Sequence, residues 1–179
     1  MKSLFIYLVC LIFTSQVAIR AGDLHKACRD GDLEAAKRAL AANPSELNQI
    51  DSALTPLMYA ARTNAALVEF LLSKGADPKI KNKLGGNALH QAAAMQNPEA
   101  VALLIKSGLD VNEREGGGLT PAMLAANSFK PKCKETLKIL IDNKADLTLK
   151  DPEGIYTIRQ MAKVDRGLAK ILKELSAKY

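Results

Sequence analysis

Histidine and cysteine are the side chains to examine first for catalysis or metal binding. The chain has two histidines and three cysteines, which are His25, His90, Cys10, Cys28 and Cys133. A zinc site needs closely spaced Cys and His ligands, and nucleophilic catalysis needs a base beside the nucleophile. The sequence has neither pattern, and the glycine runs at 85–86 and 116–118 do not precede the Gly-Lys-Ser/Thr ending of a phosphate loop. We therefore expect no catalytic residue, no metal site and no cofactor.

The first 21 residues have the order of a secretory signal peptide. Lys2 gives a positive start, residues 4–13 are an unbroken apolar run, and Thr14 begins a polar exit. A helix needs about 20 residues to cross a bilayer, and this run is about half as long. We predict a signal peptide over residues 1–21 and a mature, secreted or periplasmic domain over residues 22–179. The alternative is a membrane tether formed by an uncleaved N-terminal segment.

The composition favours small, closely stacked helices. Hydrophobic residues make up 48% of the chain, yet aromatic residues make up 4% and Trp is absent, so Ala and Leu must fill the core. The formal net charge of +6 is mildly basic, without dense Lys/Arg runs before the C-terminal region or interleaved aromatic residues. We therefore expect no nucleic-acid binding.

A repeat runs through the chain. Residues 55–61 (TPLMYAA), 87–93 (NALHQAA) and 120–126 (TPAMLAA) share one pattern, with partial copies at 24–28 and 156–162. The first four copies each end in a pair of small residues. The first residue of this pair is Ala27, Ala60, Ala92 and Ala125 in these copies, and Met161 takes its place in the last copy. The spacings are 33, 32, 33 and 36. A second apolar block and a turn with Asp follow each central copy in the same register. A fixed period of this kind is typical of a repeat solenoid.

These segments resemble the ankyrin repeat, whose signature is Thr-Pro-Leu-His-x-Ala at a period of 33. The resemblance spans residues 22–175. It implies an all-α ankyrin-repeat solenoid of about five helix-turn-helix repeats with hairpin-like turns between them, the first and last copies being partial caps. It also implies that His25 and His90 form hydrogen bonds between neighbouring repeats.

Local chemistry agrees with such helices. Thr55, Asn87 and Thr120 can each cap a helix N-terminus, and the Ala pairs let neighbouring inner helices approach closely. Gly75 and Gly108 stand where an outer helix must end in left-handed geometry. Lys144 replaces that glycine in the third full repeat, which predicts a strained or different helix end. Charged residues predict solvated caps at both ends, namely Arg29, Asp30, Asp32, Glu34, Lys37 and Arg38 in the first copy and Lys163, Arg166, Lys170, Lys173 and Lys178 in the last.

Two departures from the period fall between paired helices. One residue is missing near Asn64, and three are added within residues 127–134. The insertion is interpreted either as part of a binding surface or as simple loop drift. We predict Cys28 to be a buried small hydrophobe and Cys133 to be an exposed thiol in the insertion. About three stacked repeats between them exceed the reach of a disulfide.

The resemblance implies binding through the hairpin tips and the exposed side of the inner helices. A non-enzymatic protein–protein interaction module (adaptor, inhibitor or scaffold) is therefore expected, with one protein partner, no stable membrane anchor after signal removal, and a monomeric state. The alternatives are an accessory factor for a periplasmic or secreted redox enzyme and a secreted effector that binds a host protein. The residues placed on the binding surface by position are Arg62, Thr63, Lys83, Leu84, Met95, Asn127, Ser128 and Phe129.

Overall fold

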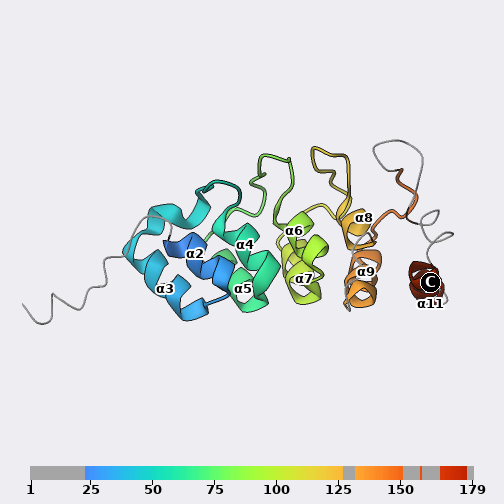
Figure 1. Cartoon of the computed structure of the whole chain (residues 1–179), viewed down its shortest axis with the longest axis horizontal. Helices are drawn as coiled ribbons and strands as arrows, with labels where there is room; N and C mark the ends of the chain where they lie inside the picture. The colour runs from blue at the N-terminus through green and yellow to red at the C-terminus, as the bar shows by residue number, and fades with distance from the viewer. Residues whose placement is uncertain (1–22, 127–131, 151–157, 159–165, 177–179) are drawn as a thin grey trace, which may run out of the picture.

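The computed structural model describes residues 23–126, 132–150, 158 and 166–176, and the chain forms a row of helix pairs (Figure 1). The described residues contain no strand, so the all-α prediction is confirmed. The helices are α2 (Asp23–Asp30) and α3 (Leu33–Ala42), followed by the 3₁₀ helix η1 (Pro44–Asn48), then α4 (Pro56–Thr63) and α5 (Ala65–Ser73), α6 (Ala88–Met95) and α7 (Pro98–Lys106), α8 (Pro121–Ala126) and α9 (Cys133–Asp142), and finally α11 (Arg166–Ser176).

Each repeat packs against its sequence neighbours. The inner helices α2, α4, α6 and α8 contact one another in that order, while α5 contacts α7 and α7 contacts α9 on the outer side. Long loops project from one edge of the row, between one pair and the next (Figure 1). The predicted close approach of the inner helices is confirmed by full burial of the alanines at their contacts, which are Ala60, Ala61, Ala92, Ala93, Ala125 and Ala126.

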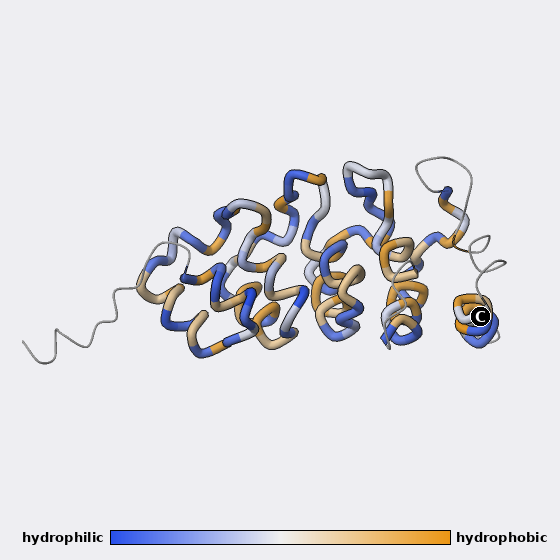
Figure 2. Tube along the Cα trace, viewed as in Figure 1, coloured by the Kyte–Doolittle hydropathy of each residue, from blue (hydrophilic) through white to orange (hydrophobic). Residues whose placement is uncertain are grey.

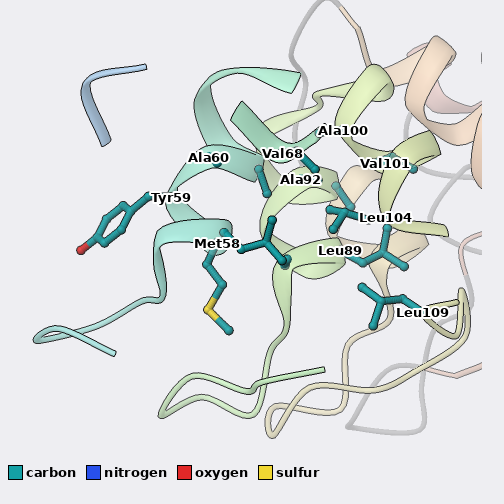
Figure 3. Close-up of a cluster of buried hydrophobic side chains, with 14 of the residues drawn as sticks. Met58, Tyr59, Ala60, Val68, Leu89, Ala92, Ala100, Val101, Leu104 and Leu109 are labelled. Carbon is teal, nitrogen blue, oxygen red and sulfur yellow. The ribbon is translucent and has the colours of Figure 1, made fainter. Parts of the chain in front are cut away.

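A continuous hydrophobic core runs through the stack. Figure 3 shows its middle part, where Val68 of α5, Leu89 of α6 and Leu104 of α7 face a shared interior. All three side chains are fully buried. Burial of a Leu or Val side chain contributes about 1.5–3 kcal/mol. The stability of each repeat therefore depends on the neighbour that covers its apolar face.

The predicted helix caps are confirmed. Thr55 Oγ1 accepts a hydrogen bond from the Met58 N–H at 3.2 Å, and Thr120 Oγ1 accepts one from the Met123 N–H at 3.3 Å. The Asn87 side chain accepts from two backbone N–H groups of the first turn of α6. These bonds satisfy N–H groups that lack partners within the helix.

The outer helices end as predicted in left-handed geometry. Gly75 and Gly108 have φ angles of +86° and +92°. Lys144 holds the same position after α9 with a φ of 68°, a conformation that disfavours a residue with a Cβ atom. The prediction of a strained helix end at Lys144 is therefore confirmed.

The missing residue shortens the link between α4 and α5 to Asn64 alone. The Asn64 backbone N–H donates to Ala60 O, while its side chain accepts from the Ala66 N–H and donates to Gly31 O of the preceding repeat. One residue thus ends a helix, starts the next and joins two repeats. Between α6 and α7, Gln96 and Asn97 share these roles.

Both ends of the stack carry exposed charge. All six charged residues named for the first copy are exposed, as are Lys170 and Lys173 of α11. Viewed almost end-on, α11 is hydrophobic on one side and hydrophilic on the other (Figure 2). The remaining charged residues predicted for the last cap either lie outside the described residues or have no described side chain. No helix within the described ranges is long and apolar enough to cross a bilayer.

Candidate functional site

Two hairpin turns between repeats are closed by their own backbones. In the loop at 82–86, the Asn82 N–H donates to Gly86 O and the Gly85 N–H donates to Asn82 O, both at 2.9 Å. The Asn82 side chain also accepts from the Leu84 and Gly86 N–H groups. The loop at 115–119 closes in the same way, since the Glu115 N–H donates to Leu119 O and the Gly118 N–H to Glu115 O.

The two turns touch each other through glycine. The Gly116 N–H donates to Leu84 O at 2.7 Å. A Cβ atom on Gly85 would lie 2.6 Å from Gly116 N, and one on Gly116 would lie 2.7 Å from Leu84 O. Neither turn can carry a larger residue there without moving. This contact fixes the backbone that presents the Leu84 side chain, which is 70% exposed.

The base of the 115–119 hairpin is held by His90. Its Nε2–H donates to Glu113 O at 3.0 Å, and its Nδ1 accepts from the Asn87 N–H at 3.3 Å. The Asn87 side chain donates to Glu113 Oε2 at 2.6 Å, and Lys81 pairs with the other carboxylate oxygen of Glu113. Burial lowers the pKa of His90, because desolvation disfavours the charged ring, although the hydrogen bond to Glu113 O and the Glu113 carboxylate act in the opposite direction.

The histidines therefore have the structural role implied by the resemblance. His25 Nε2 bonds to Gln49 O at 2.9 Å, which ties α2 to the loop before α4. His90 ties α6 to the loop before α8. In the part of the chain that the structure describes, no group of three or more His, Cys, Asp or Glu residues is arranged to hold a metal ion.

The structure separates the predicted binding residues into two groups. Lys83 and Leu84 lie exposed in a hairpin turn. Arg62 and Thr63 end α4, and the partly exposed Met95 ends α6. Each of these eight-residue helices is about 12 Å long, so its length separates its C-terminal end from the preceding hairpin. The other three predicted residues, Asn127, Ser128 and Phe129, lie outside the described residues.

Thr63 is exposed, and its hydroxyl also forms a hydrogen bond that joins two repeats. Its hydroxyl donates to Cys28 O at 2.8 Å, across the boundary between the first two repeats. The Thr63 Cβ lies 3.7 Å from where a Cβ on Gly31 would stand. A change at Thr63 would therefore alter repeat packing as well as the surface.

A polar cluster formed by Asp51, Tyr59 and Arg29 was not predicted. The Tyr59 hydroxyl donates to Asp51 Oδ2 at 3.0 Å, and the Arg29 guanidinium carbon lies 5.3 Å from the Tyr59 ring centroid. Burial alone would raise the pKa of Asp51, but donation from the Ala53 and Leu54 N–H groups and from Tyr59 lowers it. Tyr59 is itself a buried residue of the core, and Figure 3 shows its hydroxyl end directed away from Met58.

The repeat register contained the signal for this cluster. Tyr59 directly precedes the buried Ala60, and the equivalent positions are Lys26, Gln91 and Leu124. Two positions after the alanine come Arg29, Arg62 and Ala94. The side chains at these two positions of the inner helices therefore become less polar along the stack. They include Lys26, Arg29 and Arg62 in the first two repeats, and Ala94 and Leu124 in the third and fourth.

The two cysteines within the described residues, Cys28 and Cys133, are buried. Burial raises the pKa of Cys28 to about 12, so its thiol stays protonated and unreactive at neutral pH. The prediction of an exposed Cys133 is wrong. Its side chain is 7% exposed, and its Sγ donates to Ala125 O at 3.5 Å. Cys133 is the first residue of α9, so it packs against the inner helix rather than lying in the insertion. Neither Cys28 nor Cys133 is in a disulfide.

These features define a class: a helical repeat stack with paired inner and outer helices, interlocked hairpin turns and an exposed face along one side. Matches to a family model described as "Ankyrin repeats (3 copies)" cover residues 23–82 and 64–151. The chain belongs to the ankyrin-repeat family.

Curated relatives share this repeat region. The chain is 32% identical to protein glp-1 of Caenorhabditis elegans over 170 residues, which cover 86% of this chain and 13% of the relative. It is 42% identical to NF-kappa-B inhibitor delta of Mus musculus over 80 residues, covering 41% of this chain and 24% of the relative. It is 38% identical to protein phosphatase 1 regulatory subunit 12A of Mus musculus over 98 residues, covering 54% of this chain and 9% of the relative. The chain thus spans under a quarter of the length of these relatives.

Proposed function

We propose that this protein is a non-enzymatic recognition module that binds one protein partner in an exported compartment. The observation that carries the proposal is the exposure of Leu84. Among the described residues, two large hydrophobic side chains are exposed, Leu84 at 70% and Ile50 at 42%. An exposed apolar side chain on a fixed backbone can enter a partner's pocket with little loss of conformational entropy.

The surroundings of Leu84 support a protein ligand. Lys83 is exposed beside it. Arg62, which belongs to the other group of predicted binding residues, is exposed at the end of α4. Two of the relatives are, by their names, an inhibitor and a regulatory subunit. Both names describe action through another protein, which favours recognition over catalysis for this chain. We propose that the chain acts as a monomer, since the exposed row of hairpins leaves its binding edge open, and that it does not bind nucleic acid.

Partner capture tests the proposal. The whole chain is immobilised and exposed separately to the exported and the cytosolic fractions of the source organism, and retained proteins are identified by mass spectrometry. A triple variant, Arg62→Ala, Lys83→Ala and Leu84→Ala, is compared with an outer-face control, Glu69→Ala and Lys106→Ala, whose residues are also exposed. Both variants are first shown to be folded by circular dichroism.

We expect a protein that the parent and the outer-face control retain and that the triple variant binds at least about tenfold more weakly. Equal capture by both variants would contradict the binding surface. Capture from the cytosolic fraction alone would contradict the exported compartment.

The proposed export has its own test. If residues 1–21 are removed on secretion, protein purified from the exported fraction should begin at residue 22. N-terminal sequencing measures this directly. An intact N-terminus recovered with the membrane fraction would favour the tether instead.

A further inference from the structure

A pocket opens on the outer side of the first two repeats, away from the hairpin turns. Its volume is about 600 Å³, within the range of pockets that bind small organic ligands. Leu40 and Ala41 of α3 form one wall, Pro44 and Leu47 of η1 the next, and Phe70 of α5 faces them. The alkyl stems of Lys37 and Lys74 complete the lining.

The five side chains of the walls are all apolar. None of these side chains can donate or accept a hydrogen bond, so a polar group that lies against them gains no partner there. The backbone N–H and C=O groups of an extended peptide would find no side-chain partner on these walls. An alkyl chain has no such groups and gains from leaving water. The walls therefore favour a ligand with a continuous hydrocarbon body.

The charge at the pocket is positive. The Lys74 ammonium lies 5.9 Å from the Phe70 ring centroid, above the apolar wall. Lys37 pairs with Glu34 at 2.7 Å, but both side chains are substantially exposed, at 46% and 68%. Such surface pairs contribute little free energy and exchange readily. Two ammonium groups at an apolar pocket complement one anionic group on the ligand.

We propose that this pocket binds an amphiphilic monocarboxylate, with an unbranched alkyl chain against Leu40, Leu47 and Phe70 and a carboxylate between Lys37 and Lys74. The pocket lies between outer helices, so its ligand does not occupy the hairpin surface around Leu84. Binding here is a second activity, and it does not depend on the proposed protein partner.

Calorimetric titration of the whole chain at pH 7.5 tests the ligand class. The probes are octanoate, decanoate and dodecanoate, with dodecylammonium as the probe of opposite charge, all below their micelle concentrations. We expect one carboxylate per chain and tighter binding as the alkyl chain lengthens, by up to about fourfold for each added methylene group that the pocket buries. Dodecylammonium should bind several-fold more weakly than dodecanoate. Failure of dodecanoate to bind, or equal binding of both dodecyl probes, overturns the proposal.

Two matched tryptophan variants locate the binding. Ala41→Trp would fill the pocket, whereas Ala42→Trp adds the same side chain at the next position, which is exposed but does not line the pocket. Since Ala41 and Ala42 are both exposed, both variants should remain folded, and circular dichroism checks this. We expect Ala41→Trp to lose dodecanoate binding and Ala42→Trp to keep it. An equal effect of the two substitutions overturns the assignment to this pocket.

A charge reversal tests the role of the lysines. The double variant Lys37→Glu, Lys74→Glu keeps the apolar walls and inverts the charge. We expect its preference to reverse, so that dodecylammonium binds more tightly than dodecanoate. An unchanged preference for dodecanoate would show that these lysines do not recognise the carboxylate, and it would overturn the proposal.

Discussion

Lys144 and Gln96 both have left-handed backbone geometry, but for different structural reasons. Their φ angles are positive, at 68° and 54°. The exposed Lys144 holds this geometry because the outer helix must end there, although its side chain suits it poorly. The buried Gln96 reaches across to Ala125 O of the next repeat, where its Nε2–H donates at 3.1 Å. Strain is thus offset by a bond at Gln96, whereas the described structure shows no side-chain bond for Lys144.

Glycine at these two positions should have opposite effects. Lys144→Gly relieves the left-handed strain, partly offset by the greater freedom of glycine in the unfolded chain, and should stabilise the fold by about 0.5–1 kcal/mol. Gln96→Gly also relieves strain, but it removes the bond to Ala125 and the packing of a buried side chain, so its net effect should be a destabilisation of about 1–2 kcal/mol. Urea unfolding at 25 °C measures both. A Lys144→Gly protein less stable than the parent would contradict the argument.

His90 should make stability depend on pH. Its pKa in the folded protein lies below the reference value of 6.5, because burial disfavours the charged ring. The unfolded chain therefore binds a proton at His90 more readily, so this contribution to stability is present above pH 6.5 and is lost as the pH falls below it. An NMR titration of the His90 ring gives the pKa, and urea unfolding at pH 7.5 and 5.5 gives the stability. A ring pKa at or above 6.5 would contradict the prediction.

At the scale of the element, the hairpin turns behave as a connected row. The turn at 82–86 bonds to the turn at 115–119, and His90 fixes the base of the second to α6. Asn112 adds a bond to Lys144 O and accepts from the Asp146 N–H in the following turn. A side chain on one hairpin is therefore positioned by the next hairpin as well as by its own helices.

Gly75 and Gly85 have similar φ angles, so a comparison of the two distinguishes the cost of backbone strain from the cost of a steric contact. Their φ angles are +86° and +75°, but a Cβ on Gly75 meets nothing within 4 Å, whereas one on Gly85 meets Gly116 N at 2.6 Å. Gly75→Ala should cost about 1–2 kcal/mol of stability for the φ angle alone. Gly85→Ala should cost a further 1–3 kcal/mol or so, because the two turns must separate. Chemical denaturation of both variants measures the difference, and equal losses would show that the turns yield freely.

The ends of the helices could be predicted from the sequence better than the contacts between repeats. Helix caps at Thr55 and Asn87, the left-handed helix ends and the shortened link at Asn64 follow from local chemistry that a single segment contains. The contact between Gly85 and Gly116 could not be predicted in this way, since it depends on how far one repeat is offset from the next. The error at Cys133 has a similar origin, because spacing alone did not show where the insertion ends and α9 begins.

At the scale of the whole molecule, alanine sets the spacing of the stack. Ala92 is fully buried between α4 and α8, whereas Ala102 on the outer helix α7 is exposed. Ala92→Leu should destabilise the protein by about 1–3 kcal/mol, because the larger side chain forces the inner helices apart. Ala102→Leu should change the stability by less than about 0.5 kcal/mol. Thermal and urea unfolding compare them, and a tolerated Ala92→Leu would show that the stack is loosely packed.

The candidate site could be predicted only in part at this scale. Position in the repeat placed Lys83, Leu84 and Arg62 on exposed surface, since each copy has the same orientation. It did not show that the helix length separates these residues into two groups, nor that Tyr59 and Asp51 form a polar cluster. It also missed the pocket beside Phe70, which forms only where η1 follows α3.

The short range of the bonds between repeats has a consequence for how the chain folds. Asn64 reaches Gly31 across 33 residues, Asn97 reaches Ala61 across 36, and Lys134 reaches Glu174 across 40. Ordering a pair of neighbours therefore closes only a small loop, at a low entropic cost. We expect folding to start at the two well-packed repeats formed by α4–α7 and to spread outward one repeat at a time. Adding further repeats should therefore scarcely change the folding rate.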